Sequence, residues 1–219
     1  MSASESARPI TAVLWDFGGV ILTSPFDAFA GFERRNGLPE GLIRRINATN
    51  PDTNAWARLE RSEVDLDGFC ALFADEGQAH GHAIDGRALL GLLSGDVRPQ
   101  MVEALRRCKT AGYKLGCLTN NVNTGREEND SARSAAVAEA MSLFDHVTES
   151  RLMGVRKPEV RFYELACEAL AIQPGDAVFL DDLGINLKPA AALGMRTIKV
   201  VDPDVALDEL SAMLGLVLR

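Results

Sequence analysis

The sequence predicts an α/β fold, a three-layer sandwich built on a parallel sheet, with an all-helical domain inserted after the first strand. Short, fully apolar runs typical of buried strands alternate with helical patterns, which is the order expected of a parallel sheet covered on both faces. About seventy residues separate the first apolar run from the next sheet element, which is too long for an ordinary crossover. With 219 residues, 47% of them hydrophobic and 25% charged, the chain can bury a core and a smaller second unit.

The predicted elements follow in a regular order along the chain. We expect strands at residues 10–16, 113–119, 144–149, 176–181 and 196–201, of which the third has the weakest pattern. We expect helices between them at residues 97–111, 158–170, 186–193 and 203–214. Pro99 stands near the start of the first of these helices and Gly112 at its end, where proline and glycine are favoured.

The segment from residue 24 to residue 94 shows no strong strand pattern. Its helical patterns are interrupted by polar or glycine-rich breaks at residues 36–39, 47–54 and 77–86. We therefore predict a core domain of residues 1–23 and 95–219 and a helical cap domain of residues 24–94. Because the cap leaves the chain at the end of the first strand, it is placed to cover the crevice there as a lid.

The bulk composition excludes several classes of partner. A net charge of −8 argues against nucleic acid, and no apolar run has the length of a membrane span, about 18 residues. Residues 1–6 lack the basic and apolar segments of a signal peptide and are expected to form a short disordered tail. The four cysteines are widely spaced in apolar surroundings, which favours buried thiols and a cytoplasmic location. The oligomeric state stays open.

The first predicted strand ends in an acid, Asp16, followed by Phe17, Gly18 and Gly19. A carboxylate at the tip of a buried parallel strand projects into the crevice where such sheets bind ligands. The glycines let backbone amides approach an anion closely. Asp16 is therefore a candidate nucleophile or metal ligand. An ordinary turn at the end of a strand is the alternative interpretation.

Further polar residues follow the other strand ends. Thr119 and Asn120 close the second strand, where a hydroxyl and free amides suit an anion. The alternative interpretation is a threonine that caps the following helix. Lys157 precedes a proline that starts a helix, which favours anions but is also common at surfaces. Asp181 and Asp182 end the fourth strand, and the repulsion between adjacent carboxylates is offset if a divalent cation binds.

Taken in this order, the segments at residues 15–20, 118–120, 153–158, 178–182 and 184–190 resemble the haloacid dehalogenase superfamily of phosphohydrolases. Within it they are most similar to the phosphatase-like N-terminal domain of soluble epoxide hydrolases and to the related domain fused to some acyl-CoA dehydrogenases. The resemblance implies a Rossmann-like core with a helical cap. It also implies a hydrolase that acts on a small phosphorylated metabolite.

The resemblance further implies a nucleophile and a metal site. Asp16 would attack phosphorus, and water would then cleave the aspartyl-phosphate. The Asp16 carboxylate, the Gly18 carbonyl and Asp182 would hold Mg²⁺. Asp181 would orient a water on the metal or support Asp182, and Asn186 would act through hydrogen bonds.

The remaining implied roles concern the substrate. The Thr119 hydroxyl and the Asn120 amide would hold phosphate oxygens, and Lys157 would neutralise the carboxylate and the transferring group. Gly18 and Gly19 would bring backbone amides close to the substrate anion.

The sequence departs from the resemblance at Gly18. Active relatives usually carry a second aspartate there as general acid and base, so the proton donor for the leaving group is missing. Acyl, aryl or anomeric phosphates would need that proton least. Two alternatives to the phosphatase stay open. One is a metal-independent 2-haloacid dehalogenase, and the other is a relative that binds a ligand without catalysis.

The cap is expected to set substrate choice. Candidates that could face the crevice are Phe26, Trp56, Arg58 and Glu60, of which the two aromatic residues more often pack between helices. Arg126 follows the second strand in a charged run and is a candidate for holding a second anionic group.

Overall fold

The computed structural model describes residues 9–122 and 131–219, and it contains one five-stranded parallel sheet in the order β3-β2-β1-β4-β5. The strands are β1 (Ala12–Trp15), β2 (Lys114–Thr119), β3 (His146–Glu149), β4 (Ala177–Asp181) and β5 (Arg196–Lys199). All five predicted strands are confirmed, each slightly shorter than expected. Residues 1–6 and Arg126 lie outside the described residues.

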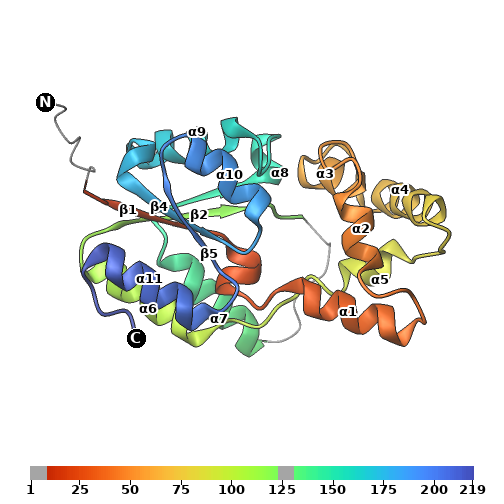
Figure 1. Cartoon of the computed structure of the whole chain (residues 1–219), viewed down its shortest axis with the longest axis horizontal. Coiled ribbons are helices and arrows are strands. Elements are labelled where there is room, and N and C mark those ends of the chain that lie inside the picture. Colours follow the sequence, from red (N-terminus) through yellow and green to blue (C-terminus); the bar gives the residue numbers. More distant parts are fainter. Residues whose placement is uncertain (1–8, 123–130) are drawn as a thin grey trace, which may run out of the picture.

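Helices cover both faces of the sheet, as the sequence predicts (Figure 1). One face carries α6 (Pro99–Thr110), α7 (Ser131–Ser142) and α11 (Pro203–Leu214), and the other carries α9 (Val160–Leu170) and α10 (Gly184–Ala192), with the short α8 (Ser150–Met153) beside them. The side chains of β1 alternate between the two layers. Val13 and Trp15 pack with α6 and α11, whereas Ala12 and Leu14 pack with α9 and α10. The α/β prediction is therefore confirmed, although α7 and α8 were not predicted.

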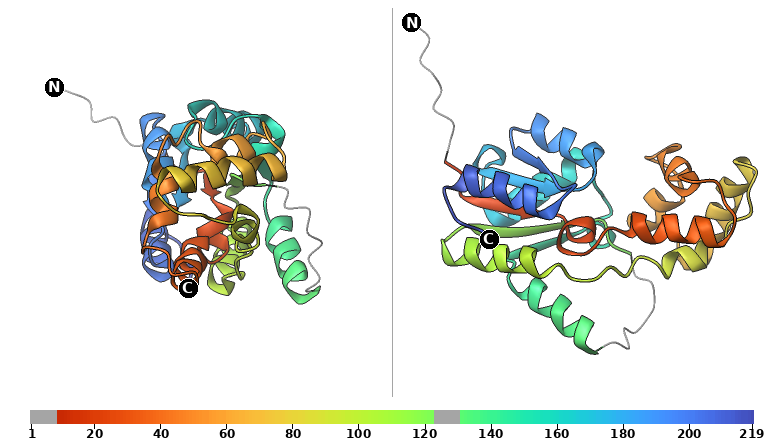
Figure 2. Two further views of the ribbon diagram at one scale, coloured as in Figure 1. Left: turned by 90° about the vertical axis from the view of Figure 1, so that its right-hand side faces the viewer. Right: turned by 60° about the horizontal axis from the view of Figure 1, so that its bottom comes forward.

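The cap consists of helices and lies to one side of the sheet, beyond the carboxyl end of β1 (Figure 2). Its helices are α1 (Pro25–Arg35), α2 (Leu42–Ala48), α3 (Ala55–Glu60), α4 (Leu66–Ala79) and α5 (Gly86–Leu90). They enclose a separate hydrophobic cluster, in which the ring centroids of Trp56 and Phe69 lie 4.6 Å apart. Trp56 therefore packs inside the cap.

The chain leaves and re-enters the core at a short paired stem. Leu22 and Val97 form an antiparallel bridge, and Thr23 N donates to Asp96 O at 2.8 Å. A Cβ atom at Gly95 would lie 2.5 Å from Thr23 O, so this close approach requires glycine. This pairing supports our proposed division into a core of residues 1–23 and 95–219 and a cap of residues 24–94.

None of the helices in the described parts combines the length and apolarity needed to cross a membrane. The cytoplasmic location stays a prediction. Of the free cysteines, Cys108, Cys117 and Cys167 are buried and Cys70 is partly exposed.

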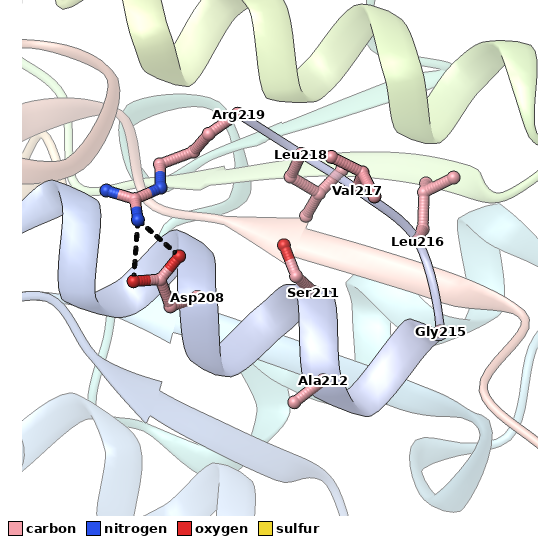
Figure 3. A pocket seen from close by; sticks show the side chains of 8 residues that line it. All are labelled: Asp208, Ser211, Ala212, Gly215, Leu216, Val217, Leu218 and Arg219. Carbon is pink, nitrogen blue, oxygen red and sulfur yellow. Dashed lines mark hydrogen bonds and ion pairs between the residues drawn. The ribbon is translucent and has the colours of Figure 1, made fainter.

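A surface groove lies between α11 and the C-terminal residues (Figure 3). Arg219 pairs with Asp208 across it, at 2.8 Å. Its described lining contains no residue that the sequence singled out.

Candidate active site

The carboxyl ends of β1 and β4 bring three acids together. Asp16 directly follows β1, Asp181 ends β4 and Asp182 follows it, so the parallel register places them at the same edge of the sheet. One carboxylate oxygen from each residue lies within 4.8 Å of the others. We call these three residues the carboxylate cluster.

The turn after β1 shapes this cluster. Asp16 Oδ1 accepts a hydrogen bond from Phe17 N at 2.7 Å, which fixes the carboxylate at the start of the turn. Gly19 has a φ of +80°, and a Cβ atom there would lie 2.3 Å from Asp182 Oδ2. Only glycine fits at that position. Gly18 has a φ of −71°, and an added Cβ would meet no atom within 4 Å.

Lys157 supplies the positive charge of the site. Its Nζ lies 2.7 Å from Asp16 Oδ1 and 2.8 Å from Asp181 Oδ2, and the residue is only 1% exposed. The alternative of an ordinary surface lysine is therefore excluded. Lys157 lies in the segment between α8 and α9, so it is a member of the site that does not come from a strand end.

Both carboxylate oxygens of Asp181 accept hydrogen bonds from neighbouring residues. Besides Lys157, its oxygens accept from Leu183 N at 2.8 Å and from Asn186 Nδ2 at 3.0 and 3.1 Å. The residue is completely buried. Asp181 and Asn186 thus form a support that holds the lysine, and Asp181 is poorly placed to replace the proton donor missing at Gly18.

Burial and the neighbouring carboxylates raise the pKa values of Asp16 and Asp182. Burial raises the pKa of Asp16 well above its ordinary value, Lys157 opposes this, and Asp181 and Asp182 add to it. Burial, assisted by Asp181, raises the pKa of Asp182 to about 6. Burial acts to lower the pKa of Lys157, but Asp16 and Asp181 outweigh it and raise that pKa.

The donor set fits a divalent cation. Lys157 pairs with two of the three carboxylates, so acids outnumber bases among the described residues of this buried cluster. Asp182 Oδ2 accepts a hydrogen bond from Ser24 Oγ at 3.3 Å. Hard oxygen donors with uncompensated charge are the ligands that Mg²⁺ prefers.

Thr119 and Asn120 lie beside the cluster in different ways. Thr119, at the end of β2, is 7% exposed. The Asn120 side chain instead binds the main chain of Lys157. Its Oδ1 accepts from Lys157 N at 2.8 Å, and its Nδ2 donates to Lys157 O at 2.9 Å. Phosphate binding by the Asn120 backbone amide stays a prediction.

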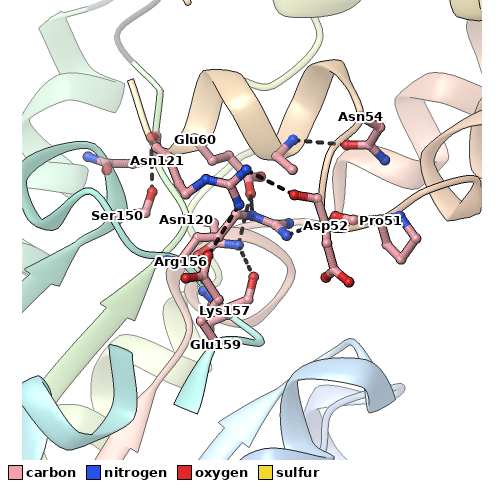
Figure 4. Close-up of polar contacts among 12 residues, drawn as sticks. Pro51, Asp52, Asn54, Glu60, Asn120, Asn121, Ser150, Arg156, Lys157 and Glu159 are labelled. Atoms are coloured by element: carbon pink, nitrogen blue, oxygen red, sulfur yellow. Dashed lines mark hydrogen bonds and ion pairs between the residues drawn. The ribbon is translucent and has the colours of Figure 1, made fainter. Parts of the chain in front are cut away.

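The cap reaches the site through Ser24 as well as through Glu60. Its Oε2 accepts from Asn120 Nδ2 at 2.9 Å and also pairs with Arg156 (Figure 4). Burial raises the pKa of Glu60, while Arg156 lowers it. Of the other cap candidates, Arg58 pairs at the surface with Glu63 at 3.7 Å. Sequence reasoning missed Arg156, for which the only signal was its position next to Lys157.

Comparison with known proteins gives a consistent family. The family model described as haloacid dehalogenase-like hydrolase matches residues 10–194. The mouse protein named acyl-CoA dehydrogenase family member 10 is 33% identical over 216 residues, which cover 96% of this chain and 20% of that protein. The pig bifunctional epoxide hydrolase 2 is 29% identical over 221 residues, covering 94% and 39%. This chain thus spans less than half the length of these two relatives.

Other similar proteins match over most of their length. Phosphatase MT3486 of Mycobacterium tuberculosis is 37% identical over 196 residues, which cover 85% of each chain. A haloacid dehalogenase family enzyme from Bacteroides thetaiotaomicron, solved in complex with magnesium and inorganic phosphate, has the same fold. Its TM-score is 0.57 at 18% identity, covering 87% of this chain and 93% of that one.

The resemblance inferred from the sequence segments is confirmed by these matches. Because the matched region runs from before β1 to beyond α10, it contains every strand-end residue of the site. The chain therefore belongs to the family of haloacid dehalogenase-like hydrolases.

Proposed function

We propose that this chain is a Mg²⁺-dependent phosphatase that hydrolyses a small phosphorylated metabolite through an aspartyl-phosphate. The observation that carries the proposal is the excess negative charge of the carboxylate cluster around one buried lysine. A protein tolerates such self-repulsion where a ligand compensates it. The phosphatase from M. tuberculosis and the magnesium and phosphate complex in the same fold support this choice.

Asp16 is the nucleophile in this proposal. Lys157 Nζ and Phe17 N both bind Oδ1, which leaves Oδ2 as the oxygen that would attack in this proposal. Oδ2 would form a bond to phosphorus while the bond from phosphorus to the leaving oxygen breaks. Water would then attack phosphorus, release inorganic phosphate and restore the Asp16 carboxylate.

The remaining residues act on charge and orientation. Lys157 would neutralise the developing negative charge, and the Thr119 hydroxyl would hold a phosphate oxygen. The carboxylates of Asp16 and Asp182, with the Gly18 carbonyl, would hold Mg²⁺, which would supply positive charge to stabilise the phosphoryl group. Because Gly18 has no side chain, the leaving oxygen takes its proton from solvent, and we infer a preference for good leaving groups.

The test is phosphate release from p-nitrophenyl phosphate with and without Mg²⁺, for the wild type and the isosteric variant Asp16→Asn. We expect Mg²⁺-dependent turnover that falls by about 10³-fold or more in this variant, because the nucleophile is lost. Asp75→Asn, an exposed aspartate on the cap helix α4, is the matched control and should retain activity.

Equal turnover in the wild type and Asp16→Asn would contradict the proposal. Chloride release from 2-chloropropionate without Mg²⁺ would instead support the dehalogenase alternative.

A further inference from the structure

Lys157 is held at both ends, and the two ends have different partners. Its ammonium group binds Asp16 and Asp181. Its main chain is bound by the Asn120 side chain, through hydrogen bonds of 2.8 Å to the N–H and 2.9 Å to the carbonyl. The position of the ammonium relative to Asp16 therefore depends on how Asn120 is oriented.

Glu60 reinforces that orientation. The Asn120 Nδ2 group has two hydrogens, and it donates both to Lys157 O and to Glu60 Oε2, at 2.9 Å each. A carboxylate only accepts hydrogen bonds, so a flipped amide would turn its oxygen toward Glu60 and its NH₂ group toward the Lys157 N–H. Both contacts would be repulsive, so Glu60 adds to the preference that the Lys157 main chain itself imposes on the Asn120 amide.

Glu60 comes from the cap, whereas Asn120 and Lys157 come from the core. Arg156, next to Lys157, pairs with the same Oε2 atom and also donates from Nη1 to Pro51 O in the cap at 3.2 Å (Figure 4). The Glu60 and Arg156 side chains are only 15% and 13% exposed. Removing either charge would leave the other largely desolvated and unpaired.

Neighbouring contacts hold the same edge of the cap. Arg61 Nη1 lies 3.2 Å from Glu159 Oε1, and Ser62 Oγ donates to Arg151 O at 3.1 Å. We call the pairs Glu60–Arg156 and Arg61–Glu159 the cap–core ion pairs. They join the end of α3 to the segment that carries Lys157, so seating of the cap and orientation of Asn120 occur together.

We propose that Glu60 is a positioning residue, which acts through Asn120 to hold Lys157 against Asp16 when the cap is seated. The inference rests on the proposed phosphatase function. In the part of the chain that the structure describes, Glu60 forms hydrogen bonds or ion pairs with Asn120 and Arg156 and with neither Asp16 nor Asp182, so its role is to orient the lysine rather than to bind the phosphoryl group. Its loss should therefore act on kcat more than on KM.

The kinetic test compares Glu60→Gln with the matched control Glu63→Gln. Glu63 is only three positions along the chain and pairs with Arg61 at the surface, without contact to Asn120. With p-nitrophenyl phosphate and Mg²⁺, we expect kcat of Glu60→Gln to fall about tenfold with KM little changed, because a small misplacement of a catalytic group is costly. Glu63→Gln should match the wild type.

Two further variants separate positioning from a merely structural role. Glu60→Asp keeps the charge, so we expect part of kcat to return, and it replaces Glu60→Gln if that variant does not fold. In an Asn120→Ala background, Glu60→Gln should cause a smaller additional loss, because its route to Lys157 through Asn120 is already removed and only its pair with Arg156 remains. Equal losses for the Glu60 and Glu63 variants, or additive losses with Asn120→Ala, would overturn the proposal.

Amide hydrogen exchange tests Glu60 without any reliance on activity. The Lys157 N–H is bound by Asn120, so we expect its exchange to accelerate by about tenfold in Glu60→Gln and to be unchanged in Glu63→Gln. An inactive wild type would overturn the phosphatase proposal, while exchange would still decide whether Glu60 positions Lys157. Unchanged exchange at Lys157 in Glu60→Gln would reject that role.

Discussion

Two polar regions meet at Lys157, and they differ in charge balance. In the carboxylate cluster, three acids share one lysine. In the cap–core ion pairs, Glu60 pairs with Arg156, and Glu159 pairs with Arg61, which also pairs with Glu63. Like the carboxylate cluster, the Glu60–Arg156 pair is largely shielded from solvent, whereas Glu159 is 37% exposed, so burial alone does not explain the difference.

The difference indicates what each region is for. A balanced pair satisfies itself and can hold two parts of the fold together without a ligand. An unbalanced cluster destabilises the fold through repulsion and desolvation, as the raised pKa values of Asp16 and Asp182 indicate. Such a cluster is expected where a cation and a substrate supply the missing charge.

Removing the positive charge of Lys157 should have the largest effect on stability and activity. Lys157→Met leaves the carboxylate cluster without a cation, and we expect the free energy of unfolding to fall by about 3–5 kcal/mol and phosphatase activity to disappear. Urea denaturation measures the stability. Lys114→Met is the control, since that lysine lies near the surface and donates to Leu170 O at 2.7 Å. Similar losses in the two variants would show that the charge of Lys157 is not needed by the cluster.

Restoring a proton donor at Gly18 should have the next largest effect. An aspartate is compatible with the backbone at Gly18 and with the open space around its Cβ position. In Gly18→Asp, we expect hydrolysis of an alkyl phosphate to increase about 10²-fold relative to an aryl phosphate, because only the poor leaving group needs the proton. Gly18→Asn, of similar size but without that proton, is the control. An unchanged ratio of the two rates in Gly18→Asp would contradict the interpretation of Gly18.

Asp182 tests the excess charge directly. Its pKa rises from an ordinary 3.8 to about 6 in the fold, so ionised Asp182 is disfavoured there. Above pH 6 it therefore lowers the free energy of unfolding, and this penalty disappears as the pH falls toward 4. With EDTA at pH 7.5, we expect Asp182→Asn to be more stable than the wild type by about 2 kcal/mol, a gain that is lost near pH 4.

Mg²⁺ should make the wild type more stable than Asp182→Asn, the reverse of the order expected with EDTA. Mg²⁺ at about 100 times its Kd would stabilise the wild type by about 3 kcal/mol, and Asp182→Asn should lose most of this effect. Thermal unfolding with EDTA and with Mg²⁺ measures both halves of the prediction. Destabilisation of Asp182→Asn under both conditions would argue that the cluster is not built for a cation.

The strand-end residues could be predicted because each depends on a local pattern. Asp16, Thr119 and Asp181 close apolar runs that β1, β2 and β4 confirm, and parallel strands bring such ends to one edge. Lys157 could be predicted because it lies in residues 153–158, one of the segments that resemble the family, but its burial was not apparent from the sequence. The helical cap was indicated by the absence of strand patterns between residues 24 and 94.

Other features could not be predicted because they depend on side chains far apart in the chain. Glu60 and Arg156 are 96 positions apart, and neither lies in a pattern that specifies the other. The resemblance implied that Asp181 orients a water on the metal or supports Asp182, and the hydrogen bonds of its oxygens to Lys157 and Asn186 became apparent only in the structure. Rotamers and packing decide such contacts, and a one-dimensional pattern does not record them.

The amino-acid sequence by itself determined the parallel sheet, the inserted helical segment and the set of polar residues at the strand ends, because periodicity and chain order are local properties. Only the tertiary structure decided which carboxylate pairs with Lys157, which glycine must remain glycine beside Asp182, and how the cap reaches Asn120. These depend on distances between segments that are remote in sequence, and packing of the whole chain sets those distances.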